Sequence, residues 1–481
     1  MDTGSLQPEV WAEQNFGEAK LGDRRRTHRL VESAKRAAQL PGGSLPHMMQ
    51  DPAALDGFYR LVDGDTVTHT SVIETHVQRT RQIMREHSGT VLILKDSTEL
   101  DFTTHQTLKK IGQIGNGSRR GYLCHNSLAV DAQTREVIGL ADQRLFIRPN
   151  VPKSETRAQK RARENRQSRL WVDSSVAVGA APVGGHWVDV CDREADTFEY
   201  FVNAVAAGRS FVVRSKSNRN CEYEENGERC KGKLHDHLRT LSGEIGKQVE
   251  VPAKPARAAT KEAAAMPAQA ARTATMAMSF AKVWLTPPRG QRRGQEKLQL
   301  WAVRLWEPNP PANVDELEWL LLTPEEVTTT ANALEVGGWY EMRWIVEDYH
   351  KGQKTGCKIE DPQFEKEERL EPTVAFLSIV AVMLLQMRGL SRSAETKDRP
   401  AREYVPPLFV TVLSQWRWPK KSPPRDMTVE EFFYALGRMG GHQNRKSDGP
   451  PGWIVLWRGW TQLQSRIDAV RKMQRQRSGE T

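Results

Sequence analysis

Short runs of β-branched and apolar residues begin near residue 90, and they constrain the fold more than any other feature of the sequence. They occupy residues 91–94, 127–130, 187–190 and 211–213, and helical patterns such as residues 71–86 precede or separate them. Strands mixed with helices are typical of an α/β or α+β core. We therefore predict a mixed sheet with helices packed against it.

Length and charge indicate a multidomain protein with a polyanionic partner. A chain of 481 residues suggests two to four domains. The 70 Lys and Arg exceed the 60 Asp and Glu, which gives a net charge of +10 and makes nucleic acid the first partner to test. The five cysteines are odd in number and show no CxxC spacing, so we expect no disulfide framework or zinc ribbon, and a reducing compartment.

The longest apolar run covers residues 373–387 and includes Ser378 and Gln386. It is short for a membrane span and interrupted by polar residues, so it predicts a buried helix. The N-terminus carries acidic residues and no apolar stretch of signal-peptide length. We expect a cytoplasmic protein without a membrane partner.

Composition divides the chain into three predicted domains. Residues 1–72 form a helical N-terminal domain, residues 73–390 the mixed core, and residues 391–481 a helical C-terminal domain. Within the core, residues 217–324 have the character of a β-rich insertion.

Four segments add detail to this division. Residues 297–305 and 318–323 have strand patterns, and residues 453–477 have a helical one. Residues 153–169, rich in Lys and Arg, do not resemble core. Residues 251–278, rich in Ala and Pro, predict a flexible or weakly helical linker.

Two aspartates are predicted at the ends of strands. Asp96 lies two residues beyond the run at 91–94, and Asp192 lies just beyond the run at 187–190. Carboxylates held at the rim of a sheet are candidates for a divalent-metal site. Taken alone, an aspartate at a strand end is more often a turn or cap residue, but two of them in one mixed sheet favour a metal site.

A third acidic residue belongs to a predicted helix at residues 339–354. At about 100° per residue, one face about 80° wide carries a carboxylate framed by cations and a phenol, namely Tyr340, Arg343, Glu347, Lys351 and Lys354. An Arg343–Glu347 surface ion pair is the simpler interpretation, but it leaves the other three residues unexplained.

Phosphoryl transfer on a nucleic acid requires such a set of residues. Three carboxylates, Asp96, Asp192 and Glu347, suffice to hold two Mg²⁺ ions when substrate phosphate and water complete the coordination. Mn²⁺ is expected to substitute. The cations on the predicted helix would then bind flanking phosphates.

An arginine cluster near the N-terminus is the other candidate for phosphate binding. Arg25, Arg26 and Arg29 share a helix face through their i+3 and i+4 spacings. The alternative is a solvated basic surface.

The spacing of Tyr340, Arg343, Glu347 and Lys354 resembles the Y-(2)-R-(3)-E-(6)-K signature of the bacterial DDE transposases of the insertion-sequence-four family, and most closely its Tn-five type. Further similar segments follow in the same order along nearly the whole chain, at residues 21–31, 96–98, 191–196, 211–216, 319–323 and 456–465.

The resemblance implies a ribonuclease-H-like catalytic core interrupted by the β-rich insertion, with Asp96, Asp192 and Glu347 as the metal-binding triad. It implies an enzyme that nicks transposon ends, forms and opens a DNA hairpin, and joins the ends to target DNA. The protein would be nucleoid-associated, and two subunits would pair the ends through their C-terminal helices.

By the same resemblance, a set of basic and aromatic residues contacts DNA: Arg25, Arg26 and Arg29 at the transposon end, and Arg214, Lys216, Trp319, Tyr340, Arg343, Lys351 and Lys354 near the cleavage site. Trp319 is similar to a tryptophan that stacks on a flipped base, although a Trp beside three leucines is otherwise typical of core. Two other functions stay open: a nuclease without strand transfer, and a non-catalytic DNA-binding regulator.

Overall fold

The computed structural model describes most of the chain, namely residues 7–152, 154–251, 253, 256, 267–288, 296–312, 314, 316–390, 396–420, 425–445 and 448–478. The chain folds into two compact units. The first unit comprises residues 1–170, 181–185 and 344–481, and the second comprises residues 171–180 and 186–343. The predicted domain boundaries at residues 72 and 390 stay predictions.

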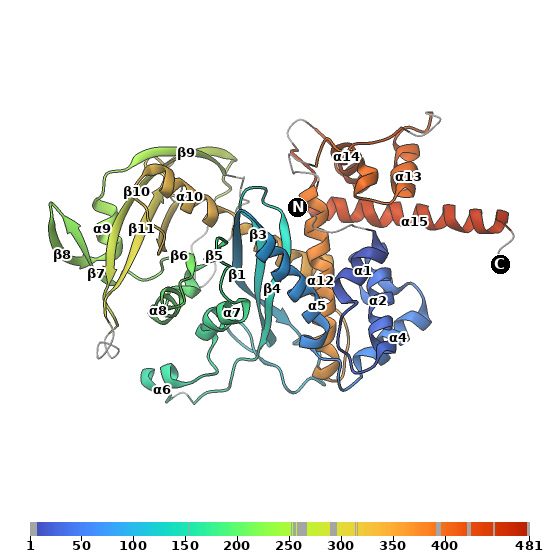
Figure 1. Ribbon diagram of the computed structural model, residues 1–481, viewed down its shortest axis with the longest axis horizontal. Helices are drawn as coiled ribbons and strands as arrows, with labels where there is room; N and C mark the ends of the chain where they lie inside the picture. Colours follow the sequence, from blue (N-terminus) through green and yellow to red (C-terminus); the bar gives the residue numbers. More distant parts are fainter. Residues whose placement is uncertain are drawn as a thin grey trace. The chain divides into compact units, whose positions relative to one another are not determined.

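The first unit contains helices from both ends of the chain and a small antiparallel sheet (Figure 1). Its elements are α1 (Pro8–Phe16), α2 (Arg24–Gln39), α3 (Leu45–Met49), α4 (Pro52–Val62), α5 (His69–Glu86), β1 (Thr90–Asp101), β2 (Gly112–Gln113), β3 (Arg120–Asp131), β4 (Val137–Phe146), α6 (Arg157–Ala162), η1 (Gln167–Arg169), α11 (Trp344–Lys351), the π-helical turn η3 (Gly352–Gly356), α12 (Glu367–Leu390), η4 (Ala401–Glu403), α13 (Pro407–Arg417), α14 (Val429–Met439) and α15 (Trp453–Ser478).

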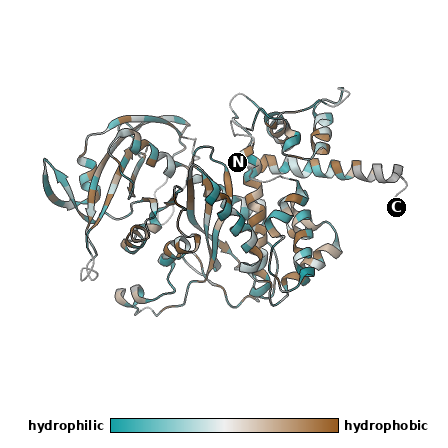
Figure 2. Cartoon of the chain, viewed as in Figure 1, coloured by the Kyte–Doolittle hydropathy of each residue, from teal (hydrophilic) through white to brown (hydrophobic). Residues whose placement is uncertain are grey.

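Helix α12 is the centre of this unit. It packs against α5, β4 and the N-terminal helices, and Figure 2 shows it as one of the most apolar segments. The helix is long and apolar enough to cross a membrane, but 89% of its apolar window is buried by the rest of the chain. The prediction of a buried helix at residues 373–387 is therefore confirmed, and α12 is a core helix.

Aromatic packing connects the N-terminal helices to α12. The ring of Phe376 lies 5.6 Å from that of Phe16 on α1 and 5.0 Å from that of Phe58 on α4. All three side chains are fully buried. Aromatic pairs at such distances add about 0.5–1.5 kcal/mol beyond the area that they bury. The N-terminal helices and α12 thus share one core.

The C-terminal helices form a second apolar cluster in this unit. The indole ring of Trp460 on α15 is fully buried, 5.1 Å from the ring of Phe409 and 6.4 Å from that of Phe432. The prediction of a helix at residues 453–477 is confirmed by α15.

The sheet of the first unit is built on β3. Strand β3 pairs antiparallel with β1 from Val91↔Asp131 to Asp101↔Gly121, and with β4 on its other edge. The predicted strands at residues 91–94 and 127–130 are present as parts of β1 and β3, which are both longer than the apolar runs.

The second unit is a mixed sheet with helices on its faces (Figure 1). Its elements are α7 (Leu170–Val178), β5 (His186–Cys191), η2 (Arg193–Ala195), α8 (Phe198–Ala206), β6 (Ser210–Arg214), β7 (Asn220–Glu225), β8 (Glu228–Lys233), α9 (Leu234–Thr240), β9 (Glu244–Val251), β10 (Arg272–Leu285), β11 (Leu298–Trp306), β12 (Glu318–Thr323) and α10 (Thr330–Glu341).

Strands β5 and β6 of this unit are parallel and are joined by α8, as parallel pairing requires a crossover. Strand β12 returns antiparallel beside β6, and β11, β10 and β7 follow outward in the sheet. Strands β7 to β12 lie between residues 220 and 323, where a β-rich insertion was expected, and the bounds of that insertion stay a prediction. The mixed α+β architecture with helical N- and C-terminal regions is consistent with a ribonuclease-H-like core.

The prediction of a linker at residues 251–278 is wrong for residues 272–278. Residues 272–278 belong to β10, where Ala274, Met276 and Met278 are buried. Small and sulfur-containing side chains fill this part of the sheet, so its composition resembles that of a linker. Most of residues 252–266 lie outside the described part of the chain. All five cysteines are free thiols, as predicted.

Candidate functional site

Asp96 lies in the middle of β1, and the prediction that it follows the end of a strand is wrong. The strand continues to Asp101, because residues 97–101 pair in register with β3 although their own sequence is polar. Asp96 is half-buried and lies directly opposite Asn126. One of its carboxylate oxygens accepts the backbone N–H of Ser97 at 2.8 Å.

The helix predicted at residues 339–354 is divided. Helix α10 ends at Glu341, a turn at Met342 and Arg343 follows, and α11 begins at Trp344. After Lys351 the chain tightens into the π-helical turn η3. The narrow single face predicted for this stretch is therefore wrong. Tyr340 and Arg343 belong to the second unit, and Glu347 belongs to the first.

A hydrogen bond between α11 and β3 places Glu347 and Asp96 on the same side of the first unit's sheet. Residues directly opposite on paired strands point to the same face, so Asn126 shares a face with Asp96. The side-chain amide of Asn126 lies 3.1 Å from Nε2 of His350, one helical turn after the exposed Glu347. Since an amide N–H can only donate, Nε2 of His350 is the acceptor.

Buried polar side chains extend this contact to α12. Gln143 of β4 donates to Oδ1 of Asn126 at 2.7 Å and to the hydroxyl of Ser378 at 3.0 Å. Gln353, just after α11, donates to the same hydroxyl at 2.9 Å. Asn126, Ser378 and Gln353 are fully buried. Buried networks of this kind hold their elements in one arrangement.

An ion pair holds the other side of α11. Asp348 accepts a hydrogen bond from Arg388 of α12 at 2.7 Å, and the Arg388 guanidinium lies 5.1 Å from the Trp344 ring. The helix that carries Glu347 is thus fixed on both sides. Asn126, Gln143 and His350 were not predicted from the sequence. The only sequence signal concerns Asn126, which belongs to a run of polar residues, His125 to Ser127, followed directly by the apolar run at 128–130.

Asp192 directly follows β5 in the second unit, as predicted. Its carboxylate accepts the backbone N–H of Glu194 at 2.8 Å, so it caps the turn η2. Among the described residues of either unit, no three His, Cys, Asp or Glu side chains are grouped closely enough to hold a metal ion. The triad of Asp96, Asp192 and Glu347 stays a prediction.

Four of the residues predicted to contact DNA are brought together in the second unit. Arg214 on β6 lies opposite Leu321 of β12, and Trp319 is two residues earlier on the same face. The Trp319 ring meets that of Tyr340 edge to face at 5.4 Å, and the Arg343 guanidinium lies 6.0 Å from the Tyr340 ring.

Burial and charge shape this cluster. Burial raises the pKa of Tyr340, although Arg343 and Arg214 oppose the shift, and burial lowers the pKa of Arg214. Trp319 is half-buried, so it is not a core residue of the kind considered as an alternative. Two guanidinium groups beside a phenol and a partly exposed indole form a surface suited to phosphate and base contacts.

Lys216, also predicted to contact DNA, is exposed just beyond β6. Its backbone N–H donates to the carboxylate of Asp196 at 2.7 Å, which leaves its side chain outside that contact.

The two lysines of the first unit are paired with acidic residues. Lys351 lies 3.0 Å from Asp348, one turn earlier on the helix. Lys354 lies 3.5 Å from Glu360.

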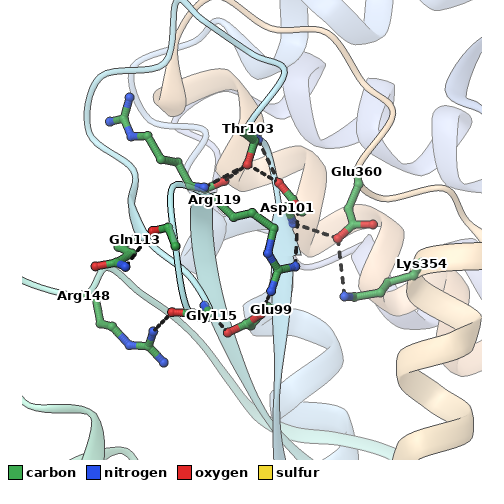
Figure 3. A network of polar contacts seen from close by, with 11 residues as sticks. Glu99, Asp101, Thr103, Gln113, Gly115, Arg119, Arg148, Lys354 and Glu360 are labelled. Carbon is green, nitrogen blue, oxygen red and sulfur yellow. Dashed lines mark hydrogen bonds and ion pairs between the residues drawn. The ribbon is translucent and has the colours of Figure 1, made fainter. Parts of the chain in front are cut away.

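Figure 3 shows the network around Lys354. Glu360 accepts the backbone N–H of Asp101 at 2.7 Å, and Arg119 lies 3.0 Å from Glu99 and 3.6 Å from Asp101. The network thus ties Lys354 to the polar end of β1. These partners of Lys354 were not predicted from the sequence.

The arginine cluster near the N-terminus lies on α2, which begins with Asp23 capping the backbone N–H of Arg25. Arg25 and Arg29 line one open hollow on this helix, together with Arg24, His28 and one carboxylate, Glu32. Arg26 turns away: its guanidinium donates to the carbonyl of Leu21 at 3.2 Å and to the hydroxyl of Thr66 at 2.6 Å.

The shared face predicted for the three arginines is therefore correct for Arg25 and Arg29 and wrong for Arg26. Helical spacing alone cannot show that Leu21, before α2, and Thr66, before α5, supply acceptors for Arg26. Arg24 and His28 take its place on the exposed face.

Residues 8–67 match a family model described as transposase DNA-binding. The match covers α1 to α4, including the basic face of α2. It supports a transposase and a DNA-binding role for the chain, with DNA as its partner.

Proposed function

We propose that the protein is a DDE transposase of the insertion-sequence-four family, of the Tn-five type, which moves DNA by cut and paste. The observation that carries this proposal is the transposase DNA-binding match at residues 8–67. It is supported by the shared position of Asp96 and Glu347 on one side of the first unit's sheet. The Y-R-E-K spacing agrees with it.

In this proposal, Asp96, Asp192 and Glu347 hold two Mg²⁺ ions. Asp and Glu oxygens are the ligands that Mg²⁺ prefers, and the exposed Glu347 and half-buried Asp96 fit that chemistry. When bound, the ions would activate the attacking oxygen and stabilise the leaving oxygen. Two subunits would pair the transposon ends.

The residues of the chain itself would position the DNA. Arg25 and Arg29 are expected to bind the transposon end, where Arg24 and His28 extend the same surface. Arg214 and Arg343 would bind phosphates near the cleavage site. Both guanidinium groups lie within hydrogen-bonding reach of the Tyr340 hydroxyl, which would help to position them. The asparagine and glutamine network would keep α11, and with it Glu347, in place.

A non-catalytic DNA-binding regulator is the second candidate. It is favoured by the extent of the family match, which covers the DNA-binding region and not the predicted triad. A regulator of this kind would bind end DNA without cutting it.

A cleavage assay separates the two candidates. DNA that flanks the gene is incubated with wild type, Glu347→Ala and a control variant, Glu365→Ala, which removes an exposed carboxylate outside the triad. We expect metal-dependent nicks and hairpins with wild type and the control and none with Glu347→Ala. Binding without any metal-dependent product would establish the regulator, and products retained by Glu347→Ala would refute the triad.

The role of Trp319 has its own test. If Trp319 stacks on a flipped base, Trp319→Ala should slow hairpin formation more than the first nick, because stacking contributes about 1–3 kcal/mol to that step. Single-turnover kinetics on a denaturing gel would resolve both products. Equal slowing of nick and hairpin would exclude the base-flipping role.

A further inference from the structure

The outer part of the second unit's sheet carries tryptophans stacked with cations. The Arg229 guanidinium of β8 lies 3.8 Å from the Trp284 ring of β10, and the Lys282 ammonium of β10 lies 5.3 Å from the Trp301 ring of β11. With Lys231 and Lys297, these residues form what we call the Trp/cation face.

Strand register shows that these residues share one side of the sheet. Trp284 lies opposite Glu222 of β7, and Lys282 lies opposite Trp301. Glu222 in turn lies opposite Lys231 of β8. Directly opposite residues, and residues two apart on a strand, point to the same face.

The opposite side of the same strands is occupied by α9. Tyr223 lies opposite Val283 and stacks on His237 of α9 at 3.5 Å. Val283 is fully buried, while Trp284 and Lys282 are half-buried and Arg229 is 49% exposed. The Trp/cation face is therefore on the solvent side of this part of the sheet, although the side chain of Glu222 within it is buried.

The charge of the face favours a polyanion. It carries four cations against two carboxylates, Glu222 and Glu224, which lie 2.6 Å from Lys297 and 3.9 Å from Arg229. Four neighbouring strands spaced about 4.8 Å apart span roughly 14 Å. This width corresponds to about four steps of 3.4 Å along one strand of duplex DNA.

The stacking also indicates how a ligand is bound. A cation that lies over an indole ring covers that ring face, so the covered face cannot stack on a base. A stacked guanidinium keeps its N–H groups directed outward in its own plane, where they can bind phosphate. Holding the side chain in this position in advance reduces the entropy lost on binding.

We propose that the Trp/cation face binds the phosphate backbone of duplex DNA, without reading its sequence. It would be a contact surface additional to the N-terminal domain and to the residues near the cleavage site. The inference rests on the DNA-binding part of the proposed function, and it does not depend on catalysis.

The test uses the full chain and a 40-base-pair duplex of random sequence. Binding is measured as a function of salt concentration for wild type, Arg229→Gln and a matched control, Arg239→Gln. Arg239 lies on α9 at the opposite side of the sheet, is also 49% exposed, and is paired with Glu318. Thermal unfolding midpoints confirm that each variant is folded.

We expect Arg229→Gln to weaken binding on the order of tenfold at 0.1 M salt and to reduce the salt slope by about 0.9, the effect of one lost phosphate contact. Arg239→Gln should leave both quantities unchanged. Equal effects of the two variants, or no effect of Arg229→Gln, would overturn the inference.

A second variant tests the role of the rings. Trp284→Leu keeps every cation but removes the stacking, so affinity should fall roughly two- to tenfold with an unchanged salt slope. Unchanged affinity would refute the role of stacking. If wild type does not bind the duplex at all, the proposed function itself fails, and this result differs from a failure confined to Arg229.

Discussion

Acid should loosen the contact between the N-terminal helices and the sheet through one buried histidine. His76 on α5 lies between Asn15 of α1 and Leu140 of β4. Its Nε2 accepts the backbone N–H of Leu140 at 3.0 Å, and its Nδ1 lies 2.6 Å from the side-chain oxygen of Asn15. These partners require the neutral ring with its proton on Nδ1.

The size of the effect follows from the pKa. Burial first, and the charge of Arg79 second, lower the pKa of His76 from 6.5 to about 3. Below pH 6.5 the unfolded chain binds a proton that the folded chain does not, so this group makes stability fall as the pH falls from 6.5 toward 3. Between pH 7.5 and pH 5.0 the loss is about 2 kcal/mol.

Hydrogen exchange followed by mass spectrometry measures this loss in the peptide that contains the Leu140 amide. Protection, corrected for the intrinsic effect of pH, should fall by about 2 kcal/mol in wild type between the two conditions. His76→Gln retains a donor and an acceptor but does not titrate. The acid-induced loss of protection in this variant should therefore be smaller than in wild type by about 2 kcal/mol. His28→Gln, which changes an exposed histidine, should behave as wild type. An equal acid loss in His76→Gln would refute the reasoning.

Three further predictions concern buried and positioned charges. Arg209→Met should destabilise the second unit by about 3–5 kcal/mol in thermal or urea unfolding, because the fully buried Asp189 loses its ion-pair partner at 3.0 Å. A loss below about 1 kcal/mol would argue against that ion pair. His350→Ala should raise the Mg²⁺ concentration needed for half-maximal cleavage, because the Asn126 amide loses its acceptor on His350. His350→Gln supplies another acceptor, so it should restore the wild-type Mg²⁺ dependence. Identical Mg²⁺ dependence in the two variants would exclude a positioning role for His350. Arg26→Ala removes two hydrogen bonds within the N-terminal region, so it should lower the thermal midpoint by an amount equivalent to about 1–2 kcal/mol. The salt slope of DNA binding should change little. A reduced salt slope with an unchanged midpoint would instead indicate that Arg26 contacts phosphate.

The strands and helices that could be predicted from sequence are those whose own residues carry the pattern. The apolar run of α12 and the β-branched runs of β5 and β6 predicted buried elements, and the structure contains them. The polar end of β1 could not be predicted, because its pairing depends on the buried residues of β3 and not on its own sequence. Asp96 was accordingly placed at a strand end.

Helical spacing failed where tertiary contacts decide the geometry. Residues 339–354 are helical in composition on both sides of Arg343, so nothing in the spacing predicts the turn there. Arg26 has the helical spacing of Arg25 and Arg29, but its side chain contacts Thr66, which is 40 residues away along the chain. The spacing within the helix cannot predict that contact. The cluster of Arg214, Trp319 and Tyr340 was expected from family resemblance, and the pairing of β6 with β12 brings its parts together.

The shared core of the N-terminal helices and α12 also sets an order of events during synthesis. Phe16 and Phe58 pack on a ring that the ribosome adds roughly 320–360 residues later. At about 5–20 residues per second, this delay is on the order of 20–70 s. During that interval the emerging helices expose the aromatic surface that Phe376 covers in the finished protein. The region that matches a transposase DNA-binding domain is therefore synthesised long before the residue that completes its core.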